Sequence, residues 1–357
     1  MLKKFFLLVR RNYWTEEIVL NKIIVRKFRE KDAEDVADIF TQVGLINNQD
    51  KRKRALERLR RIAKEPEWYD HYLVAEMNER VVGRVILEAA YPPYSELINL
   101  YVHSDYQGQG VGSSLVQKCI EIASSKKCFI MSVMADPVGN LPSHRLYSKF
   151  SFKPAILGDP AIERGHTWLF RFSENSCISE FLKRHPFAES SVSESKVIFH
   201  ERMLYRMSWR DPQTKEKIEL YLEGQPSQTS EGTMPRISGF SCKEMGLEAI
   251  VKEESKTITK GGKTKFEVSI WNISLKPLKI ALQVSIPEGT LLNPPIEHAL
   301  PIEIGSANER DIIFEFAWPS SCKLPDFTSF STIPVTVFFV IEGFTHPLIV
   351  SAGFDKA

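Results

Sequence analysis

The first half of the chain alternates between apolar patterns of two periods. A short β-like run at 23–28 is followed from residue 32 by apolar residues recurring every three or four positions, which predicts an amphipathic helix. Asn78 and Glu79 form a short polar turn between two β runs and predict a hairpin. The further expected elements are helices at about 50–64, 111–125 and 143–150, and strands at about 71–77, 80–89, 96–103, 128–135, 152–157 and 166–172.

The second half has a different pattern, because helical periodicity largely disappears after about residue 187. Strand-like runs recur there, separated by turns rich in Pro, Gly, Asn and Ser, which is typical of an antiparallel β-sandwich. The two best linker candidates are 188–196 and 224–232. The expected strands are 196–207, 217–223, 263–272, 278–286, 310–318, 332–342 and 347–354.

These patterns predict an α+β fold class with more than one domain. A mixed sheet flanked by helices occupies residues 1–175, a connecting segment with a β-hairpin occupies 176–240, and an all-β sandwich occupies 241–357.

The amino-acid composition argues against several classes of protein. The 47 Lys and Arg residues nearly balance the 45 Asp and Glu residues, which argues against a generally basic nucleic-acid-binding protein. The five cysteines are scattered without a CxxC pair, so neither a disulfide framework nor a metal site is expected. The apolar run at 5–9 is too short for a secretory signal. We expect a cytoplasmic protein that binds neither nucleic acid nor a membrane.

The most informative stretch is the glycine turn from Gln107 to Gly112, which lies between an expected strand and an expected helix. Glycines allow backbone amides to approach a ligand, and a helix N-terminus attracts anions, so this turn suits a pyrophosphate. A P-loop would need Lys and then Ser or Thr directly after the last glycine, and the dinucleotide fingerprint starting at Gly108 would need glycine at Ser113. The pattern Q-x-x-G-x-G fits instead.

With its context, the chain resembles the GNAT superfamily of N-acetyltransferases over roughly residues 22–173. The resemblance rests on V-x-x-x-x-Q-x-x-G-x-G from Val102 to Gly112 and on N-x-x-S-x-x-L-Y-x-x-x-S-F from Asn140 to Phe152, in that order along the chain. Ser143 and Ser151 stand where the family usually has Ala and Gly; both replacements are small.

The resemblance implies acetyl-CoA as cosubstrate. It implies that amides of the glycine turn hold the diphosphate, that the strand before it pairs with the pantetheine arm, and that Asn140 hydrogen-bonds that arm, although Asn140 also suits a helix cap. The residues implied in cofactor binding are Leu100, Tyr101, Val102, Gln107, Gly108, Gln109, Gly110, Val111, Gly112, Ser113 and Asn140.

The same resemblance implies an acid and a base. Tyr147 stands at the family's tyrosine position and would protonate the leaving sulfur, unless it only packs as a core aromatic. Glu96 is the expected base, with an ordinary exposed strand glutamate as the alternative; its even spacing from Val102 places both side chains on one face. His103 and His144 are competing bases, and the odd spacing of His103 points it away from Glu96.

The sequence therefore predicts an N-acetyltransferase that transfers acetyl to a primary amine, with a small-molecule or protein amine as acceptor. One alternative is a non-catalytic CoA-binding or protein-interaction module. Another is a protein lysine or N-terminal acetyltransferase whose sandwich recruits the target. A homodimer is compatible with the sequence. Residues 260–292 resemble bacterial and archaeal immunoglobulin-like domains.

Overall fold

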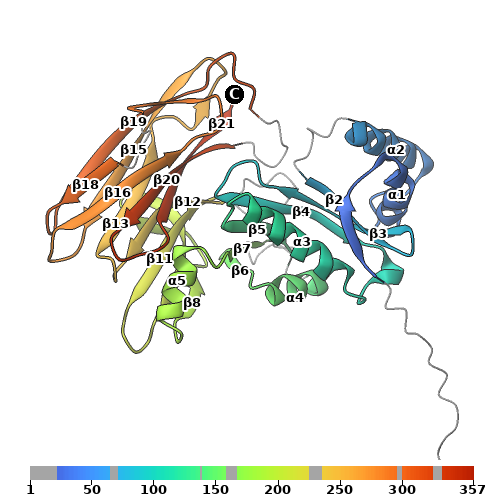
Figure 1. The fold of residues 1–357 in the computed structure, drawn as a ribbon, viewed down its shortest axis with the longest axis horizontal. Helices are drawn as coiled ribbons and strands as arrows, with labels where there is room; N and C mark the ends of the chain where they lie inside the picture. The colour runs from blue at the N-terminus through green and yellow to red at the C-terminus, as the bar shows by residue number, and fades with distance from the viewer. Residues whose placement is uncertain are drawn as a thin grey trace, which may run out of the picture.

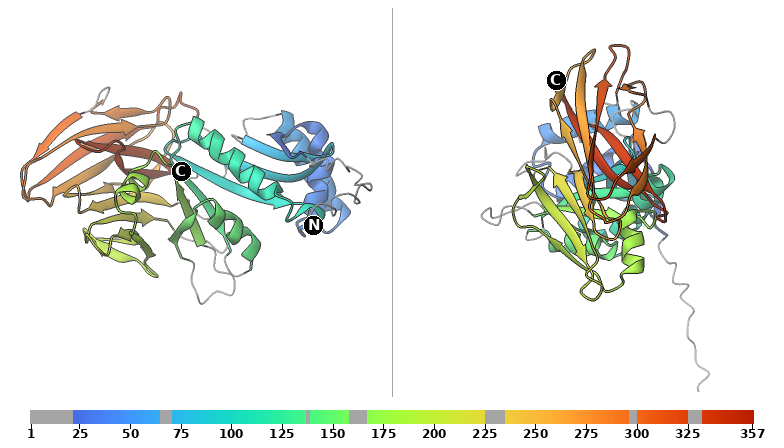
Figure 2. Two further views of the ribbon diagram at one scale, coloured as in Figure 1. Left: turned by 60° about the horizontal axis from the view of Figure 1, so that its bottom comes forward. Right: turned by 90° about the vertical axis from the view of Figure 1, so that its left-hand side faces the viewer.

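The computed structural model describes residues 22–64, 71–136, 139–157, 167–224, 235–295, 300–324 and 332–357. Within this part of the chain, a helix-flanked sheet and an all-β assembly lie end to end (Figures 1 and 2). This arrangement confirms the predicted α+β class.

The N-terminal sheet has seven strands in the order β1-β2-β3-β4-β5-β7-β6. It is mixed, because β4 and β5 pair in parallel whereas the other neighbours pair antiparallel. Asn78 and Glu79 both have positive φ, as a tight hairpin turn between β2 and β3 requires. The strands are β1 (Ile24–Lys27), β2 (His71–Met77), β3 (Arg80–Glu88), β4 (Tyr94–Val102), β5 (Ile130–Ala135), β6 (Lys153–Ile156) and β7 (Thr167–Phe172).

Helices cover both faces of this sheet. Apolar residues of α1 (Ala33–Gln42) and α2 (Gln49–Lys64) pack on one face around Val74 and Ile86. Those of α3 (Val111–Ser125) and α4 (Leu141–Lys149) pack on the other. Two short 3₁₀ helices, η1 (Glu30–Asp32) and η3 (Ser104–Tyr106), precede α1 and the glycine turn.

The C-terminal assembly consists of two sheets that share one hydrophobic core. A nine-stranded sheet runs β17-β19-β15-β13-β12-β11-β10-β8, with β9 also pairing β10, and a five-stranded sheet runs β14-β21-β20-β16-β18. Phe240 of the first sheet meets Phe339 of the second at 5.1 Å between ring centroids. An extensive all-β region is thus confirmed; its immunoglobulin-like character stays a prediction.

One helix, α5 (Cys177–Arg184), connects the two assemblies in sequence. The strands of the C-terminal assembly are β8 (Glu189–Val192), β9 (Val197–Phe199), β10 (Arg202–Arg210), β11 (Lys217–Glu223), β12 (Arg236–Cys242), β13 (Leu247–Glu253), β14 (Thr257–Ile258), β15 (Lys263–Asn272), β16 (Leu278–Ser285), β17 (Leu291–Asn293), β18 (Leu300–Ile304), β19 (Glu309–Ala317), β20 (Thr332–Ile341) and β21 (Leu348–Lys356).

Two local predictions are corrected by the structure. The apolar run 196–207 is a hairpin of β9 and β10 rather than one strand, because His200 and Glu201 adopt positive φ and turn the chain. The linker candidate 188–196 contains β8, which pairs with β10. The other linker candidate, 224–232, lies outside the described residues apart from Gly224.

The two assemblies are joined by one continuous hydrophobic core. Trp168 and Phe170 of β7 belong to the same buried cluster as the sandwich core. The buried Tyr94 hydroxyl lies 3.0 Å from Ser351 Oγ and accepts a hydrogen bond from the Ile237 amide at 3.1 Å. The C-terminal assembly therefore covers one end of the N-terminal sheet, on the face opposite α3.

Candidate functional site

The glycine turn adopts backbone geometry that side chains rarely tolerate. Gly108 and Gly110 have φ of 75° and 88°, and Gly110 is the N-cap of α3. Gln107 donates its side-chain amide to the Val102 carbonyl at 3.2 Å, and Gln109 donates to the Asp105 carbonyl at 2.9 Å. These bonds hold the turn against the end of β4, so the first amides of α3 face outward, as an anion site requires.

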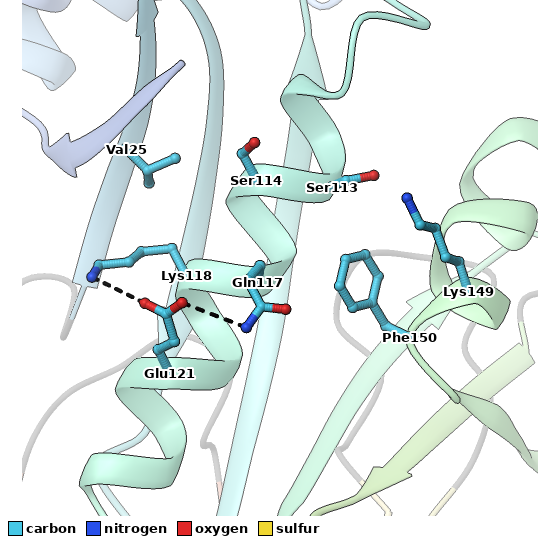
Figure 3. Close-up of a pocket in the computed structure, with 8 residues that line it drawn as sticks. All are labelled: Val25, Ser113, Ser114, Gln117, Lys118, Glu121, Lys149 and Phe150. Carbon is cyan, nitrogen blue, oxygen red and sulfur yellow. Dashed lines mark hydrogen bonds and ion pairs between the residues drawn. The ribbon is translucent and has the colours of Figure 1, made fainter. Parts of the chain in front are cut away.

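A pocket of about 530 Å³ lies along the first three turns of α3, between Val25 of β1 and the end of α4. Lys149 and Phe150 project into it from the end of α4, and Ser113 and Ser114 line it from α3 (Figure 3). Lys118 also lines it and pairs with Glu121 at 3.2 Å. The sequence pattern pointed to Ser113 but not to Lys149. The signal for Lys149 is its place in the chain, two residues after Tyr147 at the end of the same helix.

The N-terminal sheet forks between β4 and β5. β4 and β5 pair only from Tyr94–Ile130 to Glu96–Ser132, and beyond this point β5 pairs with β7 alone. Two buried serines fasten the start of the fork, since Ser132 Oγ donates to the Ser95 carbonyl and Ser95 Oγ donates to the Ile130 carbonyl, both at 3.2 Å. The segment from 97 to 102 therefore runs beside β5 without pairing with it.

A β-bulge in β4 decides which side chains meet on each face. Asn99 has a φ of 52°, and the register with β3 shifts between Ile86–Ile98 and Arg84–Tyr101. Leu100 and Val102 pack toward α3, whereas Ile98 and Tyr101 pack toward α1. The expectation that Glu96 shares a face with Val102 is therefore wrong, because one extra residue inverts the alternation between them.

Glu96 is buried on the face opposite α3. It is 7% exposed, it lies directly opposite Glu88 of β3, and its Oε2 has no hydrogen-bond partner within the described residues. Burial and the neighbouring Glu88 raise the pKa of Glu96 well above its usual value. An ordinary exposed strand glutamate is thereby excluded, and a carboxyl with a raised pKa binds a proton more strongly than an exposed one does.

Tyr147 lies on the other side of the sheet from Glu96. It is buried in the core of α3 and α4, with its ring 5.5 Å from that of Phe152. Burial, with smaller contributions from Cys119 and Tyr101, raises the pKa of Tyr147, so its phenol keeps its proton at neutral pH. The fork thus lies between a protonated phenol on one face and a basic carboxyl on the other.

Asn140 and the two histidines have structural partners or no defined role. Asn140 is the N-cap of α4 and accepts a hydrogen bond from the Ser143 amide at 3.2 Å. His103 is buried between Gln42 of α1 and the Asp105 amide. Its contact with α1 places it on the Glu96 side of the sheet, contrary to the odd-spacing argument, because the bulge intervenes. His144 lies on α4, remote from Glu96 in the fold.

The first turn of α3 packs closely against β4 and α4. Gly112 faces β4, and a Cβ at this position would come within 3.1 Å of Leu146 and 3.8 Å of Val102. In the described part of the chain there is no grouping of three or more His, Cys, Asp or Glu that could hold a metal ion. The same part contains no helix with the length and apolar character needed to span a membrane.

Part of the chain is similar in sequence to known acetyltransferases. Residues 34–152 match the sequence model of the family described as acetyltransferase (GNAT) family. A putative ribosomal protein bS18 alanine N-acetyltransferase of Bacillus subtilis is 28% identical over 90 residues, which are 24% of this chain and 56% of that relative. The chain therefore spans about half the length of this curated relative.

Solved acetyltransferases align over a similar part of the chain. Ard1 from Thermoplasma volcanium is 18% identical with a TM-score of 0.34, and covers 42% of this chain and 97% of its own. The PaiA N-acetyltransferase of Thermoplasma acidophilum, solved with coenzyme A, is 16% identical with a TM-score of 0.34, and covers 43% of this chain and 99% of its own.

Proposed function

Because residues 34–152 match the sequence model of the acetyltransferase (GNAT) family, we propose that the protein transfers an acetyl group from acetyl-CoA to a primary amine. The observation that carries this proposal is the fork between β4 and β5, with Glu96 on one face and Tyr147 on the other, where β4 leads into a glycine turn suited to a diphosphate. The similarity of this chain to named N-acetyltransferases supports it.

The residues present fit coenzyme A. Outward amides from Gln109 to Ser113 would hold its diphosphate, and Lys149 would add a positive charge beside them in the pocket. The edge of β4 from Leu100 to Val102 would pair with the pantetheine arm as an added strand. Asn140 would contribute its side-chain NH₂, since its carbonyl oxygen already caps α4.

Two residues of the chain would each carry out one of the proton transfers. Acetyl-CoA supplies an activated thioester carbonyl, which the acceptor amine attacks directly; a C–N bond forms and the C–S bond breaks. Glu96 takes the proton that the amine loses, directly or through one water, and Tyr147 gives a proton to the departing sulfur. A backbone amide of β4 near Val102 would stabilise the oxyanion.

The acceptor would approach from the face opposite α3. Tyr94 and Ile98 flank Glu96 on this face; Tyr94 packs in the core shared with the C-terminal assembly and Ile98 against α1 and α2. The acceptor site would therefore lie where these two coverings meet. A sandwich that recruits a protein amine is compatible with this position, so both small amines and peptide N-termini belong in the assay.

The test is acetyl transfer measured with purified protein and a panel of amines, beside coenzyme A binding by calorimetry. We expect binding and turnover, and a fall in kcat of roughly 10²–10⁴-fold in Tyr147→Phe with coenzyme A affinity unchanged. The matched control is Tyr106→Phe, which removes a phenol hydroxyl at an outer position beside His103. Binding without turnover of any acceptor would favour a non-catalytic module; absence of binding would refute both.

A further inference from the structure

Arg84 of β3 is a buried cation among aromatic rings. It is 4% exposed, and its guanidinium carbon lies 4.6 Å from the ring centroid of Tyr72, 5.1 Å from Phe40 and 5.6 Å from Tyr101. Its Nε and Nη2 atoms are buried without a hydrogen-bond partner in the part of the chain that the structure describes. Aromatic faces stabilise a guanidinium but accept no strong hydrogen bonds, so these donors are unused.

Four carboxylates of α1, η1 and β2 already have partners of their own. Asp35 of α1 accepts a hydrogen bond from the Val81 amide at 2.9 Å, and Asp38 pairs with Arg52 at 2.8 Å. Asp32 and Glu76 both pair with Arg26. A planar guanidinium with a free fork of donors matches a carboxylate in two parallel hydrogen bonds, and an anion must therefore come from outside these residues.

Arg84 lies on the sheet face where the acceptor would bind, and not on the α3 face where the diphosphate would bind. Its neighbour Gly83 faces α3, where a Cβ would meet Val111 and Leu115, so Arg84 points to the opposite face. Glu88 lies on that same face, four residues or roughly 13 Å further along β3. Glu96 of β4 lies opposite Glu88. Tyr72 lies opposite Ile86, so the contact with its ring places the guanidinium along β3 in the direction of Glu88.

From this geometry we infer that Arg84 binds a carboxylate of the acceptor, so that the preferred acceptor is an amine carrying an acid group close to the amine. The inference rests on the proposed function. The carboxylate fixes the acceptor at Arg84 and leaves its amine toward Glu96. Arg84 is then a determinant of acceptor specificity that makes no contact with coenzyme A.

Matched acceptor pairs test this inference. Glycine, alanine and β-alanine are compared with their carboxamides, and a peptide beginning Ala-Asp is compared with one beginning Ala-Asn, which separates a free amino acid from an acidic peptide. In at least one of these two comparisons, the free amino acids or the acidic peptide, we expect kcat/KM to be at least tenfold higher for the acid than for its amide. The carboxamide's amine is the less basic, so simple amine reactivity favours the opposite order. Calorimetry on the coenzyme A complex is expected to give the same preference in binding.

Variants assign the preference to Arg84. Arg84→Met keeps the volume and loses the donors, so the preference is expected to fall to about one while coenzyme A affinity stays constant; Arg84→Lys should keep part of it, and serves if the Met variant does not fold. Arg80→Met removes an exposed guanidinium from the same strand as control. The inference about Arg84 is wrong if the wild type uses acids and amides equally, or if the preference is unchanged in both Arg84 variants. Neither result would contradict the proposed function. Absence of coenzyme A binding overturns the proposed function.

Discussion

Glu96 of β4 lies directly opposite Glu88 of β3, and both carboxyl groups are buried on the sheet face opposite α3. Two buried carboxyls so close together disfavour a second negative charge, which holds a proton on Glu96 at a higher pH than usual. The same feature that suits Glu96 to act as a base therefore makes its ionised form unfavourable for the fold.

Glu96→Gln is expected to lower activity and raise stability. A carboxyl whose folded-state pKa is raised stabilises the fold below its unfolded pKa of about 4.3, and this contribution is lost as pH rises through the folded pKa. Gln does not ionise, so the variant should gain Tm relative to wild type, and more at pH 8 than at pH 5. Its kcat/KM should fall by roughly 10²–10⁴-fold.

Thermal unfolding and steady-state kinetics across pH measure both effects. Glu254→Gln, at an exposed position of the C-terminal assembly, is the control and should change neither. A Glu96→Gln protein that loses more stability at pH 8 than at pH 5 would contradict the assignment of the raised pKa.

Gly110→Ala is expected to weaken coenzyme A binding about tenfold. The left-handed backbone at Gly110 costs a non-glycine residue about 1–2 kcal/mol, and relaxing it would move the amides at the start of α3. Gly44 also has a positive φ, of 79°, with open space around it, and it lies after α1 away from the turn. Gly44→Ala should therefore lose similar stability but keep its affinity in calorimetry; equal affinities in the two variants would argue against the diphosphate site.

Tyr94→Phe is expected to destabilise the protein by about 1–3 kcal/mol. The change removes the hydroxyl that accepts from the Ile237 amide and contacts Ser351, which leaves a buried donor unsatisfied. Denaturant unfolding followed by fluorescence measures the loss. Tyr205→Phe, which keeps the ring beneath Lys196, should cost far less; a similar cost would mean that the contact between the assemblies contributes little.

A fragment ending at residue 175 is expected not to fold stably alone. Removing the C-terminal assembly would expose Trp168, Phe170, Tyr94 and Ile130, which are at most 1% exposed in the full chain. We expect low soluble yield and strong binding of a hydrophobic dye. A soluble fragment with a cooperative thermal transition would contradict this expectation and would make residue 175 the boundary of an independently folding domain.

The sequence determined the features that depend on neighbours along the chain. The glycine turn at 107–112, the helix that starts at Val111 and the hairpin at Asn78–Glu79 follow from local backbone preferences, and the structure places each as expected. The order of strands and helices in the first half follows from apolar periodicity for the same reason.

Tertiary structure alone decided which side chains meet. Asn99 adds one residue to β4, and because side chains alternate along a strand, this moved Glu96 to the face opposite Val102. The weakly patterned β8 is a strand only because β10 offers it a partner. The rings around Arg84 and the Tyr94–Ser351 contact bring together residues from distant strands and helices. Their partnership is set by packing across the sheet, which spacing along the chain does not encode.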